Sequence, residues 1–204
     1  MPAYDYIYLG DNARAPYGPR SFDVVYRFTR QAVMRLFAEG CQLVILACNT
    51  ASAKALRTIQ QRDLPVWDET RRVLGVIRPT VELMDRISRS KHVGVVGTAG
   101  TIASGSYQIE IAKMFPHIQV TSEACPMWVP LVENNEFDSP GADYFVRKYL
   151  DELFRKDPLI DTLILGCTHY PLLIEKIRRY VPTGVTLLPQ GEYVASSLED
   201  YLYR

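Results

Sequence analysis

The sequence predicts an α/β protein of two similar lobes, each with a mostly parallel sheet flanked by helices. Short apolar runs alternate with segments of helical periodicity along the whole chain, a pattern typical of parallel sheets with helical crossovers. The runs LVILA, HVGVV and TLIL are apolar on both faces, as strands covered on both sides are. In addition, LVILACNTASAKALR and TLILGCTHYPLLIEKIR share one plan: a buried strand, Cys, two polar residues, then a helix. This internal echo indicates two related lobes.

The helices have recognisable ends. Ser21 is a suitable N-cap for a first helix with apolar residues at helical spacing, and Gly40 ends it, as glycine commonly does. Pro116 and Pro182 follow two later helices. Strands are expected at 4–10, 43–48, 92–98, 118–124, 161–166 and 184–188, and further helices at 51–61, 79–88, 104–115, 141–155, 171–180 and 191–203.

The two lobes are expected to divide the chain unevenly. Residues 1–74 with 187–204 form the first lobe, and residues 75–186 form the second. The stretch RDLPVWDETRRVLGVIR (62–78) is the expected boundary. In open α/β sheets, ligands bind beyond the carboxyl ends of the strands, so the active site is expected in the cleft between the lobes.

Composition excludes several classes of function. Lys+Arg and Asp+Glu are both 23 and the net charge is zero, which argues against a nucleic-acid partner. The longest apolar runs are too short to span a bilayer, so no membrane partner is expected. Because no targeting signal opens the chain, we expect a cytoplasmic protein.

The cysteines favour neither a disulfide scaffold nor a metal site. No pair has CxxC spacing, and the histidines form no ligand cluster with them. In a protein without a secretory signal, free thiols are the expected state. The cysteines are Cys41, Cys48, Cys125 and Cys167, and the histidines are His92, His117 and His169.

Cys48 and Cys167 are the candidate catalytic groups. Each follows a strand and precedes a helix, where unpaired N–H groups and the helix dipole are expected to lower a thiol pKa. His169 lies two residues after Cys167 and is placed to tune that thiol or relay its proton. The alternative is that both cysteines are small buried residues at strand ends. Two matched thiols facing one cleft would suit proton removal from one face of an acidic carbon and delivery to the other.

Polar residues at three turns are candidate substrate contacts. Asn49, Thr50 and Thr168 follow the two cysteines at helix starts, where carboxylates bind readily. Thr98 and Thr101 lie in VGVVGTAGTIASGSY, which has neither dinucleotide-binding spacing nor the Lys of a phosphate loop. Helix capping is the alternative for Asn49, Thr50, Thr98 and Thr101.

The remaining candidates stand alone in the sequence. Tyr17 and Gly18 end the turn-rich segment GDNARAPYG, which follows an apolar run and is either part of a site or a plain turn. Glu133, in VPLVENNEF, is either a carboxylate that acts on substrate or on Cys167, or a solvated side chain. His92 and His117 are expected to be structural.

Taken together, YLGDNARAPYG, LACNTASA, GVVGTAGTI, VPLVE and LGCTHYPLL, in this order, resemble glutamate racemase, a cofactor-independent member of the aspartate/glutamate racemase family. The resemblance implies that Cys48 and Cys167 are the acid/base thiols that interconvert L- and D-glutamate, assisted at Cys167 by Glu133 and His169. It implies no metal and no pyridoxal phosphate, and a bacterial role in supplying D-glutamate for peptidoglycan. The substrate contacts that it implies are Tyr17, Gly18, Asn49, Thr50, Thr98, Thr101, Thr168 and His169.

The chain also departs from the family pattern. It has no match to the family's N-terminal Asp-Ser-Gly strand, and it stops at SSLEDYLYR, before the expected C-terminal end. A family member trimmed at both ends is therefore expected, with an apolar gap that is exposed or covered by another chain, as in a homodimer. An aspartate or hydantoin racemase, or a catalytically inactive member acting as a binding protein, are the alternatives.

Overall fold

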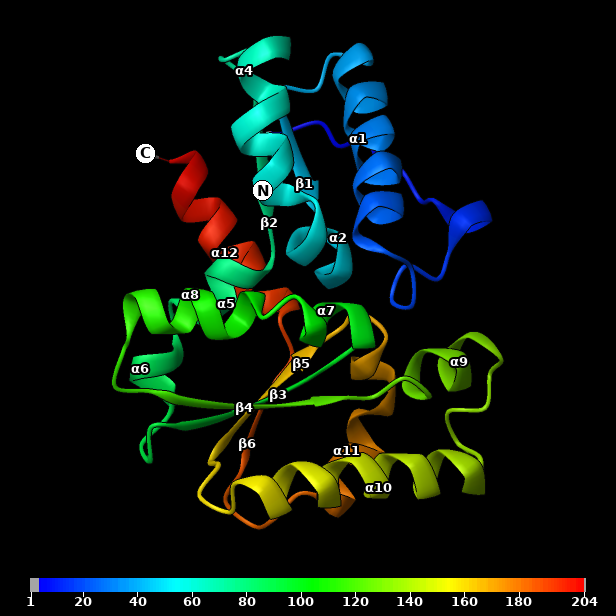
Figure 1. Cartoon of the computed structure of the whole chain (residues 1–204), viewed down its shortest axis with the longest axis vertical. Helices are drawn as coiled ribbons and strands as arrows, with labels where there is room; N and C mark the ends of the chain where they lie inside the picture. Colours follow the sequence, from blue (N-terminus) through cyan, green and yellow to red (C-terminus); the bar gives the residue numbers. More distant parts are fainter. Residues whose placement is uncertain (1–3, 204) are drawn as a thin grey trace.

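The computed structural model describes residues 4–203 and has two parallel sheets flanked by helices (Figure 1). One sheet pairs β1 with β2, and the other has the order β4-β3-β5-β6. All four strand pairings are parallel, which confirms the predicted fold class. The strands are β1 (Leu43–Leu46), β2 (Arg72–Gly75), β3 (His92–Gly97), β4 (Gln119–Ala124), β5 (Thr162–Gly166) and β6 (Thr186–Leu188).

The small sheet packs against α1 (Phe22–Ala38) and has its own core, which includes Val33, Phe37 and Val44. The Ser21 side chain caps α1 by accepting a hydrogen bond from the Val24 backbone N–H. Gly40, just past the end of α1, has φ of +94°, a left-handed conformation that glycine adopts without steric cost. Both predicted ends of this helix are therefore confirmed.

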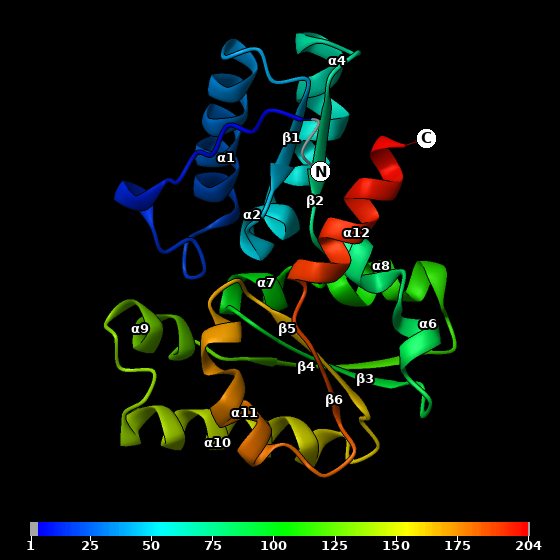
Figure 2. The same ribbon diagram turned by 180° about the vertical axis from the view of Figure 1, so that it is seen from behind.

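The four-stranded sheet is covered on both faces, so its strands have apolar residues in both directions. On one face, α10 (Pro140–Lys156) and α11 (Ile174–Tyr180) cover a core that includes Leu163 and Leu165 (Figure 2). On the other face, α5 (Ile77–Val81), α6 (Met84–Ile87) and α8 (Ser106–Met114) cover Val93, Val95 and Ile164. The remaining α-helices are α2 (Asn49–Lys54), α3 (Leu56–Thr58), α4 (Leu64–Trp67), α7 (Ala99–Ala103), α9 (Trp128–Glu133) and α12 (Gly191–Leu202).

One expected strand is absent from the structure, and one observed strand was not predicted. Residues 4–10 form no strand: this aromatic segment has high β propensity, but propensity gives no strand without a paired neighbour, and Tyr8 is 92% exposed. Conversely, β2 lies inside the stretch 62–78 expected to be the boundary, because a four-residue strand with one buried side chain shows too little alternation to be recognised. The division of the chain at residues 74 and 187 stays a prediction.

Within residues 4–203, no helix combines the length and the hydrophobicity needed to cross a bilayer.

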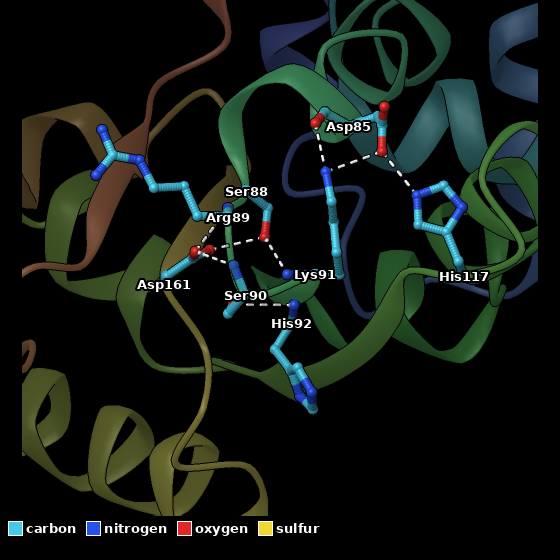
Figure 3. Close-up of polar contacts among 8 residues, drawn as sticks. All are labelled: Asp85, Ser88, Arg89, Ser90, Lys91, His92, His117 and Asp161. Atoms are coloured by element: carbon cyan, nitrogen blue, oxygen red, sulfur yellow. Dashed lines mark hydrogen bonds and ion pairs between the residues drawn. The ribbon is translucent and has the colours of Figure 1, made fainter.

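The Asp161 carboxylate, next to the start of β5, holds the loop before β3 in place by hydrogen bonds (Figure 3). It accepts hydrogen bonds from the Ser88 hydroxyl at 2.7 Å, the Arg89 N–H at 2.8 Å and the Ser90 N–H at 2.6 Å. Burial by itself raises the pKa of Asp161, but these hydrogen bonds, with one from Thr162, lower it to about 2.

We expect Asp161→Ala to lower the free energy of unfolding by about 2 kcal/mol, because it removes several hydrogen bonds to a charged group. A carboxylate whose pKa is lowered on folding stabilises the protein above its unfolded pKa and loses that effect as the pH falls toward the folded pKa. The deficit of the variant in urea unfolding should therefore be full above pH 4 and shrink toward pH 2. Asp151→Ala, at an exposed position on α10, is the control; an equal loss in both variants would contradict the prediction.

Candidate functional site

Cys48 and Cys167 occupy equivalent positions in the two sheets. Cys48 lies two residues after β1 and is the N-cap residue of α2. Cys167 directly follows β5 and precedes the 3-10 helix Tyr170–Leu173. The predicted strand–Cys–helix plan is thus present twice, and both thiols stand at the carboxyl ends of parallel strands, where α/β proteins bind ligands.

Burial dominates the acidity of both thiols. It raises the pKa of Cys48, against the backbone N–H groups of Ala51 and Thr50, which lower it. Burial, together with a charge on Cys48, raises the pKa of Cys167 to about 12, against the backbone N–H groups of His169 and Thr168, which lower it. The expectation of lowered thiol pKa values is therefore wrong, because desolvation of the thiolate outweighs the helix-start N–H groups. The effect of Cys48 on the Cys167 pKa indicates that the two thiols lie within electrostatic range of one another.

A histidine and a carboxylate stand beside Cys167. His169 Nδ1 lies 3.7 Å from Cys167 Sγ, and His169 Nε2 lies 2.5 Å from Glu133 Oε1. Glu133 is the last residue of α9, and this helix is held in place by Trp128, whose ring meets that of Tyr170 at 4.7 Å between centroids. Glu133 is far from His169 in the sequence. In the structure its carboxylate contacts the His169 imidazole, which in turn contacts the Cys167 thiol.

Three threonine hydroxyls join the turn after Cys48 to the large sheet. Thr50 Oγ1 lies 2.9 Å from Thr98 Oγ1 and 3.2 Å from Thr101 Oγ1. The Thr98 and Thr101 hydroxyls are 3.1 Å apart, and the three residues are buried. Thr98 also accepts a hydrogen bond from the Thr101 N–H as the N-cap of α7. Thr98 therefore caps α7 and also belongs to this cluster of hydroxyl groups.

Tyr17 and Gly18 reach this cluster from the N-terminal loop. The Tyr17 hydroxyl donates to the Asp11 carboxylate, and burial together with that contact raises the pKa of Tyr17. The Gly18 carbonyl accepts a hydrogen bond from the Gly100 N–H at 3.0 Å, and a Cβ on Gly18 would lie 2.8 Å from Thr98 Cβ. Close packing of the Gly18 backbone against the Thr98 side chain thus explains why the loop has glycine here.

Asn49 is buried and both ends of its side-chain amide are paired. Its Nδ2 donates to Gln190 Oε1 at 2.6 Å, and its Oδ1 accepts from the Tyr107 hydroxyl at 2.7 Å. Thr168, in contrast, is exposed beside Cys167. The sequence predicted neither Tyr107 nor Gln190, because each is a single polar residue without a motif and pairs with residues far away in the chain.

Two surface hollows of the described chain are lined by residues between 178 and 187 and between 60 and 74. Neither contains a candidate site residue.

His92 and His117 lie away from the thiols, as expected. His92, at the amino end of β3, pairs through Nδ1 with Asp157 at 2.9 Å. His117 Nε2 lies 2.7 Å from Asp85, which also contacts Lys91 (Figure 3). Among residues 4–203, no group of three or more His, Cys, Asp or Glu side chains is placed to hold a metal ion.

Comparison with known proteins gives one consistent family. The family model for Asp/Glu/Hydantoin racemase matches residues 1–195. Glutamate racemase from Shouchella clausii is 41% identical over 204 residues, which are 100% of this chain and 70% of that protein.

Solved structures agree with the sequence relatives. A glutamate racemase isoform from Bacillus anthracis superposes with a TM-score of 0.86 at 36% identity, over 95% of this chain and 70% of that one. Glutamate racemase from Francisella tularensis in complex with D-glutamate gives 0.84 at 31% identity, over 95% and 69%. With a matching family model over nearly its whole length, paired strand-end thiols and these relatives, the chain belongs to the Asp/Glu/Hydantoin racemase family.

Proposed function

We propose that this protein interconverts L- and D-glutamate, with Cys48 and Cys167 as the two acid/base groups. The observation that carries the proposal is the pair of thiols at equivalent strand ends of two sheets, within electrostatic range of each other. The relatives named above are glutamate racemases, and one of them was solved with D-glutamate, which favours glutamate over aspartate or a hydantoin as the substrate.

The reaction needs one proton removed and one returned. One thiolate takes the Cα proton from one face of glutamate and becomes a thiol, while the opposite thiol gives its proton to the other face of the carbanion and becomes a thiolate. Atoms and charge balance, and the reverse reaction exchanges the two roles. The proposed mechanism has no step that uses a metal ion or pyridoxal phosphate.

The raised thiol pKa values assign a role to the substrate itself. Burial favours the protonated form of both thiols. A substrate ammonium group bound nearby would favour the charged form of the thiol that it approaches. Glutamate binding would thus help to generate the base, and the second thiol would stay protonated as the acid.

The other site residues would bind and orient glutamate. The proposed binding residues offer hydroxyl, amide and backbone N–H groups that suit carboxylates. His169 would also assist Cys167, and Glu133 would orient His169. The proposed binding set is Tyr17, Gly18, Asn49, Thr50, Thr98, Thr101, Thr168 and His169.

The cellular setting is part of the proposal. Free thiols are stable in a reducing compartment, and all four cysteines are free in the structure, which supports a location in the cytoplasm. A bacterial supply of D-glutamate for peptidoglycan is the proposed role. A homodimer stays a prediction.

Chiral chromatography tests the activity directly. The purified chain is incubated without cofactor, separately with L-glutamate, D-glutamate and L-aspartate. We expect each glutamate enantiomer to approach an equal mixture, with aspartate little changed. Conversion of aspartate instead would overturn the substrate, and no conversion by a folded chain would favour an inactive binding protein.

Removal of the Glu133 carboxylate tests its orienting role. We expect Glu133→Gln to lower kcat about 10-fold and leave KM nearly unchanged, because the imidazole beside Cys167 loses its charged partner. Glu136→Gln, an exposed glutamate three residues later, is the matched control and should keep full activity. Equal rates for the two variants would show that Glu133 is a solvated side chain without a catalytic role.

A further inference from the structure

Three buried side chains form a closed ring of hydrogen bonds where the two sheets meet. Asn49 Nδ2 donates to Gln190 Oε1 at 2.6 Å, Gln190 Nε2 donates to the Tyr107 hydroxyl at 2.7 Å, and that hydroxyl donates to Asn49 Oδ1 at 2.7 Å. Each member gives one hydrogen bond and accepts one. The donors thus follow one another in a single direction around the ring.

The ring is buried and well supported. Tyr107, Asn49 and Gln190 are 1%, 2% and 8% exposed. Gln190 Nε2 also donates to Thr80 Oγ1 at 2.7 Å, and the Thr80 hydroxyl donates to the Val76 carbonyl at 2.9 Å. Because buried polar groups are costly when unpaired, removal of one member should leave the other two without a good alternative.

The phenol remains a donor in this environment. Burial raises the pKa of Tyr107, although the hydrogen bond from Gln190 lowers it. A protonated Tyr107 can only give its hydrogen to Asn49 Oδ1, since Gln190 already donates to the phenol oxygen. This fixes which end of the Asn49 amide carries oxygen and which carries nitrogen.

The ring lies close to the chain segments that carry Cys48 and Cys167. Asn49 directly follows Cys48 in the chain, and Gly166 directly precedes Cys167. A Cβ on Gly166 would lie 3.4 Å from Tyr107 Cε2, so the Tyr107 ring packs against the strand end that carries Cys167. A charge on Cys167 also raises the pKa of Tyr107. Tyr107 therefore contacts the residue after Cys48 and packs beside the residue before Cys167.

We propose that Tyr107 and Gln190 are positioning residues that fix the spacing of the two thiols and the orientation of the Asn49 amide. The inference rests on the proposed glutamate racemisation. The ring uses one hydrogen and one lone pair of the Asn49 amide and leaves one of each for substrate. Its action is through Asn49 and the two strand ends, without contact between Tyr107 or Gln190 and the reacting atoms.

Tyr107→Phe removes one hydroxyl and keeps the aromatic ring. We expect kcat to fall about 10- to 100-fold, as for misplaced catalytic groups, with a smaller change in KM. We also expect a larger primary isotope effect with glutamate deuterated at Cα. Thiols that are less firmly positioned make proton transfer to and from Cα slower, so this step becomes more rate-limiting. Tyr149→Phe, which removes the hydroxyl of another buried tyrosine on α10, is the matched control and should change neither quantity.

Gln190→Asn is the second variant, and it applies also if Tyr107→Phe does not fold. The amide is kept but shortened by one methylene, so it cannot close the ring; the same loss of kcat and larger isotope effect are expected. The variant with both substitutions should lower kcat little more than the more damaging single substitution does, since the same ring is broken in each case. Wild-type kcat and isotope effect in folded ring variants would overturn the inference, whereas an inactive wild type would overturn the proposed function itself.

Discussion

Cys48→Ser and Cys167→Ser are each expected to lower kcat for racemisation by about 10²- to 10⁴-fold, the range for loss of a general acid or base. A serine hydroxyl gives up its proton far less readily than a thiol, so one face of the substrate loses its base. Cys41→Ser, the same change at a cysteine outside the site, is the control and should retain full activity.

The two variants should also differ from one another. Each keeps one thiol, so each should exchange the Cα hydrogen of one glutamate enantiomer with deuterium from the solvent, without inversion. The favoured enantiomer should be opposite in the two variants. Mild and equal losses in both, with no preference for either enantiomer, would mean that these cysteines are structural residues at strand ends.

Gly100→Ala is expected to lower kcat/KM about 100-fold, because it displaces the loop that carries Tyr17 and Gly18. A Cβ on Gly100 would lie 2.5 Å from the Gly18 carbonyl oxygen and 2.6 Å from Lys54 Nζ. The lysine end can move, but the carbonyl oxygen belongs to backbone that is hydrogen-bonded to Gly100 itself. The loop must therefore shift, and a shift of about 1 Å in a site can cost about 100-fold in rate.

Gly141→Ala is the matched control for this prediction. Gly141 lies in the first turn of α10, where the nearest atom to an added Cβ is 3.5 Å away. Alanine should be neutral or stabilising there, since it favours helix by about 1 kcal/mol over glycine. Steady-state kinetics and thermal unfolding of both variants distinguish a local shift from general instability. Equal kcat/KM in the two variants would contradict the account of the loop.

Local sequence patterns predicted most of the fold, because the buried strands and the helix ends are determined by residues close together in the sequence. The covered strands β3 and β5 are apolar on both faces, and Ser21 and Gly40 end α1 by their own backbone and side-chain chemistry. Residues 4–10 show the limit of such reasoning, since an aromatic, extended-looking segment forms a strand only if a neighbour pairs with it. No local sequence pattern identifies the strand that would pair with it.

The site was predictable to the extent that its residues repeat or match a family. The strand–Cys–helix echo identifies Cys48 and Cys167, and the resemblance adds Glu133, which the structure places beside His169. The ring could not be predicted in this way, because Asn49 and Gln190 are 141 residues apart in the chain. The raised thiol pKa values were also missed, since burial is a property of the folded molecule.

Deuterium uptake at Cα of L- and D-glutamate in heavy water tests the central claim most directly, because it follows the proton that the two thiols are proposed to move. The account predicts uptake into both enantiomers without added cofactor, and its loss after treatment with a thiol-blocking reagent. No uptake by a chain that circular dichroism shows to be folded, or uptake that survives blocking of the thiols, would contradict it.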